Sequence, residues 1–97
     1  MQRKKQEQFY TCLSFDNFKC HLMFNGRTPQ KRRAIRLFDL YKLINRLKTT
    51  TRICIANEIP LYSFSRSLLS RDLKTLKDRN LIFSINERIQ WNPSRQR

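Results

Sequence analysis

Apolar residues recur at three- and four-residue steps along the middle of the chain, and this spacing predicts helices. The first stripe is Ala34, Leu37, Phe38, Tyr41, Ile44 and Leu47. Thr28 is a good N-cap, and Pro29 suits the first position of a helix. We expect this first helix to begin there and to run to about Leu47 or Lys48.

A second, shorter helix is expected over residues 52–59, with Thr51 available as its N-cap. Pro60 ends this helix, because proline lacks a backbone N–H and disfavours helical backbone in the residue before it. We expect residues 61–64 to form a loop.

A third helix is expected from Ser65 to about Asn80, since asparagine suits the left-handed backbone that often ends a helix. Its buried stripe is Leu69, Leu73 and Leu76, with Leu68 beside them. Its opposite side is polar and carries Arg66, Ser67, Ser70, Arg71 and Lys74.

A β-hairpin is expected after the third helix, with strands over 81–85 and 89–92. We predict a three-residue tip, Asn86-Glu87-Arg88. Such a tip pairs Ile85 with Ile89 and Phe83 with Trp91, so that all four side chains share one face.

The segment before the first helix fits two interpretations. Strands over 9–15 and 18–24, joined by Asp16-Asn17, form a hairpin with one almost wholly apolar face. Alternatively, Asp16 is the N-cap of a short helix that ends at Asn25-Gly26. We favour the hairpin, which then either completes the core or forms a dimer interface.

The charge of the chain restricts its partners. The 97 residues include 21 Lys and Arg but only 7 Asp and Glu, which gives a formal charge of +14. Residues 27–97 hold 17 of the basic and 5 of the acidic groups, so the excess lies in the helical region. Such a charge favours a polyanionic partner, because it repels itself in a compact monomer. We expect nucleic acid as the partner, with an anionic membrane surface as the competing one. No membrane span is expected, since no apolar run approaches the roughly 18 residues that a span needs.

The same composition argues against an enzyme or a metal protein. One glycine cannot build a phosphate-binding loop, and the acidic residues do not form a pair for metal-dependent hydrolysis. Three irregularly spaced cysteines without a C-x-x-C motif provide neither a disulfide framework nor a zinc site. We therefore expect no catalytic residue, no metal and no cofactor, and a reducing, cytoplasmic location.

From residue 28 onward the expected order of helix, short helix, helix and hairpin resembles a winged helix-turn-helix. The residues strengthen this: Thr51-Arg52 opens the second helix, Ile55-Ala56 follows, and residues 65–82 are SRSLLSRDLKTLKDRNLI. They are similar to the DNA-binding end of bacterial regulators of the cyclic-AMP-receptor and FNR type. There, T-R, I-A/G and S-R-x-x-[VL]-x-R-x-L-K-x-L-x-x-x-x-L-I occupy these places. The linker before Ser65 is longer here and contains Pro60, and only the DNA-binding half of those regulators is matched.

The resemblance implies an α+β fold, a winged helix-turn-helix of three helices plus a C-terminal wing hairpin, to which the N-terminal hairpin is added. The expected organisation is a flexible basic N-terminus (1–8), the hairpin (9–26), the winged-helix DNA-binding domain (27–93) and a basic tail (94–97).

The resemblance also implies that residues 65–80 are a recognition helix, which enters the major groove of double-stranded DNA. The expected base-reading residues are Arg66, Ser67, Ser70 and Arg71, with the two arginines suited to bidentate contact with guanine. The expected phosphate-binding residues are Lys31, Arg32, Arg33, Arg52, Lys74, Lys77, Asn86 and Arg88.

The function expected on these grounds is sequence-specific DNA binding in transcriptional regulation, as a homodimer on a two-fold site. An accessory factor in plasmid or phage replication or excision is an alternative. A winged-helix protein-interaction module and an RNA- or ribosome-associated basic protein are two more. An interaction module does not need the Arg66 and Arg71 face, and RNA binding more often uses exposed aromatic residues.

Overall fold

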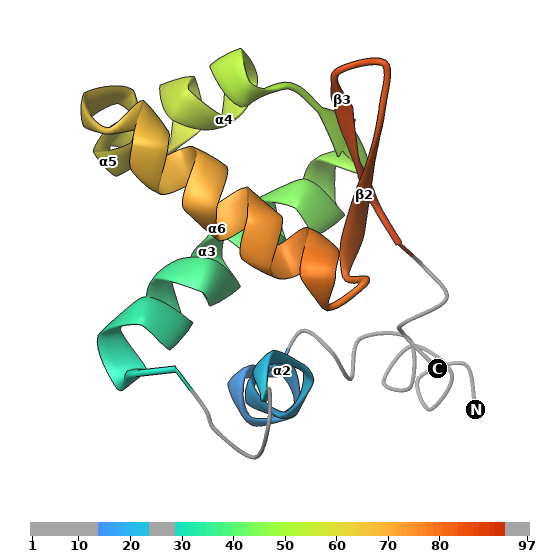
Figure 1. The fold of residues 1–97 in the computed structure, drawn as a ribbon. Coiled ribbons are helices and arrows are strands. Elements are labelled where there is room, and N and C mark those ends of the chain that lie inside the picture. The colour runs from blue at the N-terminus through green and yellow to red at the C-terminus, as the bar shows by residue number, and fades with distance from the viewer. Residues whose placement is uncertain (1–13, 24–28, 93–97) are drawn as a thin grey trace.

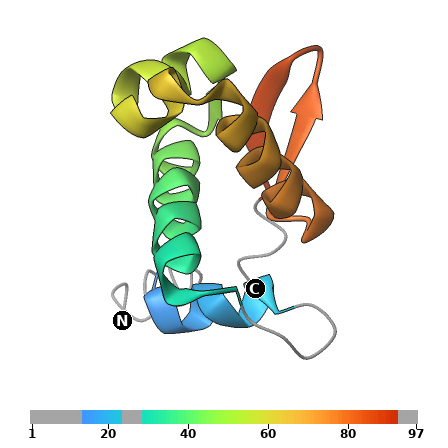
Figure 2. The same cartoon turned by 60° about the vertical axis from the view of Figure 1, so that its left-hand side comes forward.

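Helix α3 (Lys31–Leu47) is the longest element that the structure describes, and it runs from one end of the fold to the other (Figures 1 and 2). The structure is a computed structural model that describes residues 14–23 and 29–92. Over these residues the chain is an α+β fold with five helices and one three-stranded antiparallel sheet. The expected basic segments at 1–8 and 94–97 lie outside the described residues.

The predicted apolar stripe of α3 forms the centre of the core. Ala34, Leu37, Tyr41 and Ile44 are all fully buried. The helix ends at Leu47 as predicted, and the next residue, Lys48, has a left-handed backbone (φ 67°). At the other end the N-cap is Gln30, which makes no side-chain capping bond, so Pro29 precedes the helix rather than opening it. The predicted cap, Thr28, lies outside the described residues.

Residues predicted to form an N-terminal hairpin instead form helix α2 (Phe15–Leu22), so the favoured hairpin is wrong for this stretch. The Ser14 side chain caps the helix by accepting a bond from the Asn17 amide at 3.2 Å. Phe18 and Leu22 lie four residues apart, so both face α3, and both are fully buried. The alternative of a short helix is confirmed, although the helix is capped by Ser14 rather than Asp16 and ends before Asn25. Residues 9–13 and 24–26 of the predicted hairpin lie outside the described part of the chain.

Packing against α3 explains why α2 is helical. The Phe18 ring lies 5.1 Å from the ring of Phe38 and 5.2 Å from that of Tyr41, and Phe15 lies 5.5 Å from Phe38, each measured between centroids. Aromatic pairs at these separations stabilise beyond the area they bury. These contacts hold α2 across one end of α3, as Figure 2 shows.

Helix α4 (Arg52–Glu58) begins as predicted, because the Thr51 hydroxyl accepts a bond from the Cys54 amide at 3.3 Å. It ends as predicted at the extended residue Ile59, before Pro60. The loop expected over 61–64 is wrong, since Pro60–Phe64 form the five-residue helix α5. Proline is favourable at the first position of a helix, and the fully buried Tyr62 side chain anchors this turn in the core.

Helix α6 (Arg66–Asp78) has both predicted ends. The Ser65 hydroxyl accepts a bond from the Leu68 amide at 3.3 Å. Asn80 has a left-handed backbone (φ 61°), and its amide donates to the Lys77 carbonyl at 2.9 Å. The Leu81 amide donates to the Leu76 carbonyl at 3.0 Å, which completes a Schellman motif.

The sheet consists of β1 (Thr49–Thr50), β2 (Ile82–Ile85) and β3 (Arg88–Trp91), in the order β1-β3-β2. Strand β1 was not predicted; it pairs with β3 and so ties the end of α3 to the hairpin. In Figure 1 the hairpin stands beside α6, with α4 and α5 on the opposite side of the fold from α2.

The predicted hairpin is present, but its register is shifted by one residue. The tip contains only Asn86 and Glu87, both with left-handed backbone, as in a type I′ turn. Ile85 therefore pairs with Arg88, and Phe83 pairs with Gln90, which excludes the predicted pairs with Ile89 and Trp91. Because a shift of one residue exchanges the two faces of a strand, the exposed side of the hairpin carries Phe83 and Ile85.

Candidate nucleic-acid interface

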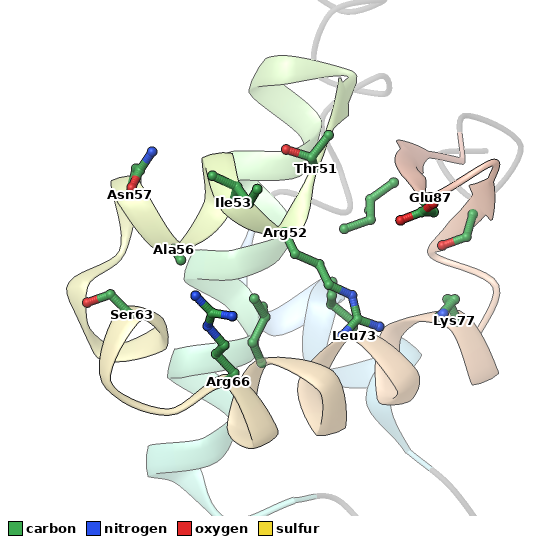
Figure 3. A pocket seen from close by; sticks show the side chains of 13 residues that line it. Thr51, Arg52, Ile53, Ala56, Asn57, Ser63, Arg66, Leu73, Lys77 and Glu87 are labelled. Carbon is green, nitrogen blue, oxygen red and sulfur yellow. The ribbon is translucent and has the colours of Figure 1, made fainter.

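Helix α6 has two edges that contact other elements and an exposed face between them. Arg66, Leu69, Leu73 and Lys77 line a groove that α6 forms with α4 and the β2–β3 hairpin (Figure 3). On the opposite edge, Asp72 and Thr75 bond to side chains of α3. The exposed face between these edges carries Ser67, Arg71 and Lys74. Three- and four-residue spacing therefore sorts the predicted residues of α6 onto one side of the helix.

The groove has an apolar floor and a charged rim. Leu69, Leu73 and Ile89 form part of the floor and are at most 3% exposed. The charged residues that line it are Arg52, Arg66, Lys77 and Glu87. Figure 3 shows the Arg52 side chain directed from α4 toward α6 and the Arg66 side chain directed from α6 toward α4. Three cations from two helices therefore meet one acid at this groove.

One hydrogen bond joins α4 to α6 at the groove. Arg52 Nη1 donates to Ser70 Oγ at a distance of 2.6 Å. This bond brings together a residue predicted to bind phosphate and a residue predicted to read bases. Arg52 is exposed, so the remaining donors of its guanidinium face solvent.

The other predicted base-reading residues lie at the surface of α6. Arg66, Ser67 and Arg71 are exposed, and neither arginine side chain has a hydrogen bond or ion pair with a residue that the structure describes. Ser67 Oγ lies 3.5 Å from Ser65 Oγ, at the limit of a hydrogen bond. These three side chains are available to a partner.

Two predicted phosphate-binding lysines also belong to α6. Lys74 Nζ lies 3.4 Å from a carboxylate oxygen of Asp78, and their side chains are 75% and 52% exposed. Exposed ion pairs of this kind contribute little free energy, so Lys74 can exchange Asp78 for a phosphate at little cost. Lys77 is half-buried at the groove.

The predicted residues of the hairpin do not join the groove. Arg88 lies on the sheet face opposite to Ile89, and its Nε donates to Thr49 Oγ1 at 3.2 Å. Asn86 is exposed at the tip. Among the tip residues, only Glu87 lines the groove.

The basic start of α3 forms a separate patch. Lys31 and Arg32 are exposed, but Arg33 is half-buried and its Nη2 donates to Thr75 Oγ1 at 2.9 Å. Arg33 Nε is buried and has no hydrogen-bond partner among the residues that the structure describes. This patch borders the α3 edge of α6 rather than the groove edge, and Arg33 fastens α3 to α6.

A buried charged cluster was missed by the sequence analysis. Asp72 of α6 is fully buried and accepts two bonds from Arg36 of α3, from Nε at 2.7 Å and from Nη2 at 3.0 Å. The Tyr62 hydroxyl of α5 donates to the same carboxylate at 2.6 Å. The signal was present, since Asp72 lies between Leu69 and Leu76 on the apolar stripe, where a carboxylate requires a partner.

The cluster raises the pKa of two of its members, Tyr62 and Arg36. Burial, together with the bond to Asp72, raises the pKa of Tyr62 far above its usual value. The hydrogen bond to Asp72 raises the pKa of Arg36. Tyr62 is therefore a neutral donor and Arg36 a charged one over the whole physiological range.

The described residues hold no group of three or more His, Cys, Asp or Glu side chains placed to bind a metal ion. None of the helices found in residues 14–23 and 29–92 is long and apolar enough to cross a membrane. Comparison with protein-family models, with curated proteins and with solved structures gives no match for this chain.

Proposed function

We propose that the protein binds double-stranded DNA at specific sequences, as a winged helix-turn-helix protein whose recognition helix is α6. Its role would be transcriptional regulation. The observation that carries this proposal is the outer side of α6, where Arg66 and Arg71 are exposed and the Arg52–Ser70 bond adds a cation from α4.

The chemistry of these residues suits DNA. An α-helix fits the major groove, and residues in its N-terminal half reach the base edges. Arg66 is the first residue of α6, and Arg71 lies in its second turn. Arginine offers two parallel donors, which match the O6 and N7 atoms of guanine. Ser67 and Ser70 are small, so they allow the helix backbone to approach the bases.

The surrounding cations supply contacts that do not depend on sequence. Arg52 is the first residue of α4, and Lys74 and Lys77 continue along α6 beyond Arg71. Contacts of this kind to phosphates position a protein on the duplex and dominate its affinity.

Most acidic groups of the fold do not oppose an anionic partner. Asp16, Asp39, Glu58, Asp72 and Asp78 each lie in an ion pair with a lysine or arginine. Among the acidic residues that the structure describes, only Glu87 has no ion pair. Glu87 lines the groove itself, so its single carboxylate is outnumbered there by the three cations Arg52, Arg66 and Lys77.

The order of elements supports the winged-helix type. Helix α3, strand β1, helices α4 and α6, and the β2–β3 hairpin follow one another, with α5 between the last two helices. In this proposal the β2–β3 hairpin is the wing. A homodimer is part of the proposal, because single modules of this type bind weakly and a two-fold site doubles the contacts.

The decisive experiment is selection from a pool of randomised DNA duplexes, with wild type, Arg66→Ala and Arg71→Ala. We expect a defined motif for wild type, and a loss of preference at one or two base positions for each variant. The matched control is Lys42→Ala, which removes one exposed cation from α3, away from the groove. It should keep the motif. Uniform binding of all sequences by wild type, with a steep dependence on salt, would refute sequence-specific recognition.

A further inference from the structure

We propose that Tyr62, Asp72 and Arg36 together are positioning residues that fix the orientation of α6 and thereby determine how sharply the protein discriminates between DNA sequences. The inference rests on the proposed function. None of the three residues need touch DNA, since they act through the recognition helix.

The orientation of α6 needs contacts of this kind because the helical backbone is interrupted twice between α4 and α6. Ile59, before α5, and Ser65, between α5 and α6, both have extended backbone, with φ of −117° and −141°. Helix α5 is only five residues long. Side-chain contacts must therefore contribute to fixing how α6 lies against the helices before it.

The Asp72 carboxylate connects α6 to two other helices. It accepts a 2.6 Å bond from Tyr62 of α5 and a two-pronged bond from Arg36 of α3. A bidentate arginine fixes the plane of a carboxylate as well as its distance. Three helices thus meet at one group, which is fully buried in α6.

The position of Asp72 in α6 links this geometry to base contacts. It follows Arg71 directly, so the rotation of α6 about its axis that satisfies Asp72 also sets the direction of the Arg71 side chain. Functional side chains need placement within roughly 0.5 Å and 10–20°. Loss of one bond to Asp72 should therefore misdirect base contacts while leaving the surface charge unchanged.

The bonds of the cluster are better suited to fixing the relative orientation of the helices than to raising the stability of the fold. A buried ion pair is often replaceable by apolar residues without loss of stability, because desolvation offsets much of the attraction. Directional bonds to one carboxylate, in contrast, permit only one relative arrangement of α3, α5 and α6.

The test compares Tyr62→Phe, which keeps the ring but removes the donor, with Phe18→Leu, which weakens the aromatic packing between α2 and α3 and lies outside the cluster. Arg36→Lys is a second variant, which keeps the charge but replaces the planar, two-pronged guanidinium with a single ammonium group. Dissociation constants are measured for the selected duplex and for a random duplex. We expect both cluster variants to bind the selected duplex about tenfold more weakly, the effect of one lost base contact, with random-duplex affinity and salt dependence unchanged.

An equal loss for both duplexes, as expected for Phe18→Leu if folding alone matters, would overturn the inference. Residual dipolar couplings of the DNA-free protein provide an independent measure of the angle between α3 and α6, the two helices that the Arg36–Asp72 bonds join. The angle should change or broaden in Tyr62→Phe and stay at its wild-type value in Phe18→Leu. An unchanged angle in Tyr62→Phe would also overturn the inference. Failure of wild type to select any motif would refute the proposed function, and the couplings would still test the positioning.

Discussion

The guanidinium of Arg52 and the hydroxyl of Ser70 are held 2.6 Å apart, across the junction between α4 and α6. Arg52 opens α4, and Ser70 lies between Arg66 and Arg71 on the side of α6 that turns to solvent. The bond therefore places a cation from one helix against the proposed base-reading surface of the next. Under the proposed function, α4 would in this way contribute to the DNA surface without entering the groove of the duplex.

Removal of either member of this pair should affect DNA binding differently. Arg52→Ala removes a phosphate contact, so the slope of log K against log salt should become shallower by about 0.9. Ser70→Ala should leave the slope unchanged, because the charge remains, and Ser70→Thr retains a hydroxyl as the control. Binding is measured by fluorescence anisotropy over a series of salt concentrations. Identical slopes for wild type and Arg52→Ala would show that Arg52 contacts no phosphate.

The central helices could be predicted from sequence because their ends depend on local chemistry. Thr51 and Ser65 cap α4 and α6 with their own hydroxyls, and Asn80 takes the left-handed backbone after α6. Each of these residues acts within four positions of its own place in the chain. The polar side of α6 was predictable for the same reason, since it follows from helical spacing.

The elements that were predicted wrongly depend on contacts between distant residues. The segment around Phe18 alternates well enough for a strand, and its packing on Phe38 and Tyr41 favours the helix beyond the local cap from Ser14. The hairpin register depends on whether Arg88 belongs to the turn, and here it pairs with Ile85. Likewise, the partner of Asp72 is Arg36, which lies 36 positions earlier and which a stripe of leucines does not reveal.

The hairpin register predicts which apolar residues matter for stability. Ile82 and Ile89 are 2% and 3% exposed, whereas Phe83 is 36% exposed and Ile85 is 49% exposed. Ile82→Ala and Ile89→Ala should each lower the free energy of unfolding by about 2–5 kcal/mol. Phe83→Thr and Ile85→Thr should each lower it by less than the two core substitutions do, since both side chains lie at the surface. Urea denaturation measures all four, and a large loss for Ile85→Thr would contradict the register.

The hairpin tip should be improved by glycine. Glu87 has a φ of 66°, a conformation that is unfavourable for residues with a Cβ and free of that penalty for glycine. Asn-Gly is also the preferred pair for this turn. Glu87→Gly should therefore raise the free energy of unfolding by about 0.5–1 kcal/mol. Ser84→Gly, within β2, is the control and should lower it. A lower stability for Glu87→Gly would show that the Glu87 side chain makes a stabilising contact.

The two charged members of the buried cluster should differ in their effect on stability. Arg36→Met leaves the Asp72 carboxylate fully buried with Tyr62 as its remaining side-chain donor, and should destabilise by about 3–5 kcal/mol. Asp72→Asn should cost less, because the Arg36 side chain is 23% exposed and can turn to water. Denaturant unfolding of both variants checks this order. Equal losses would mean that the carboxylate is better solvated than its burial indicates.

Alkaline pH should weaken the fold through Tyr62. Its pKa is raised in the folded state, first by burial and then by the bond to Asp72, whereas the unfolded chain titrates near 10. The stability gained from the neutral phenol is therefore complete below pH 10 and is lost as the pH rises above it. The slope should approach about 1.4 kcal/mol per pH unit, because the unfolded state then releases a proton that the folded state retains. Tyr62→Phe lacks this group, so the advantage of wild type over the variant should shrink at that rate in urea unfolding above pH 10. Parallel stability curves for the two proteins would show that Tyr62 ionises as readily in the folded state as in the unfolded chain.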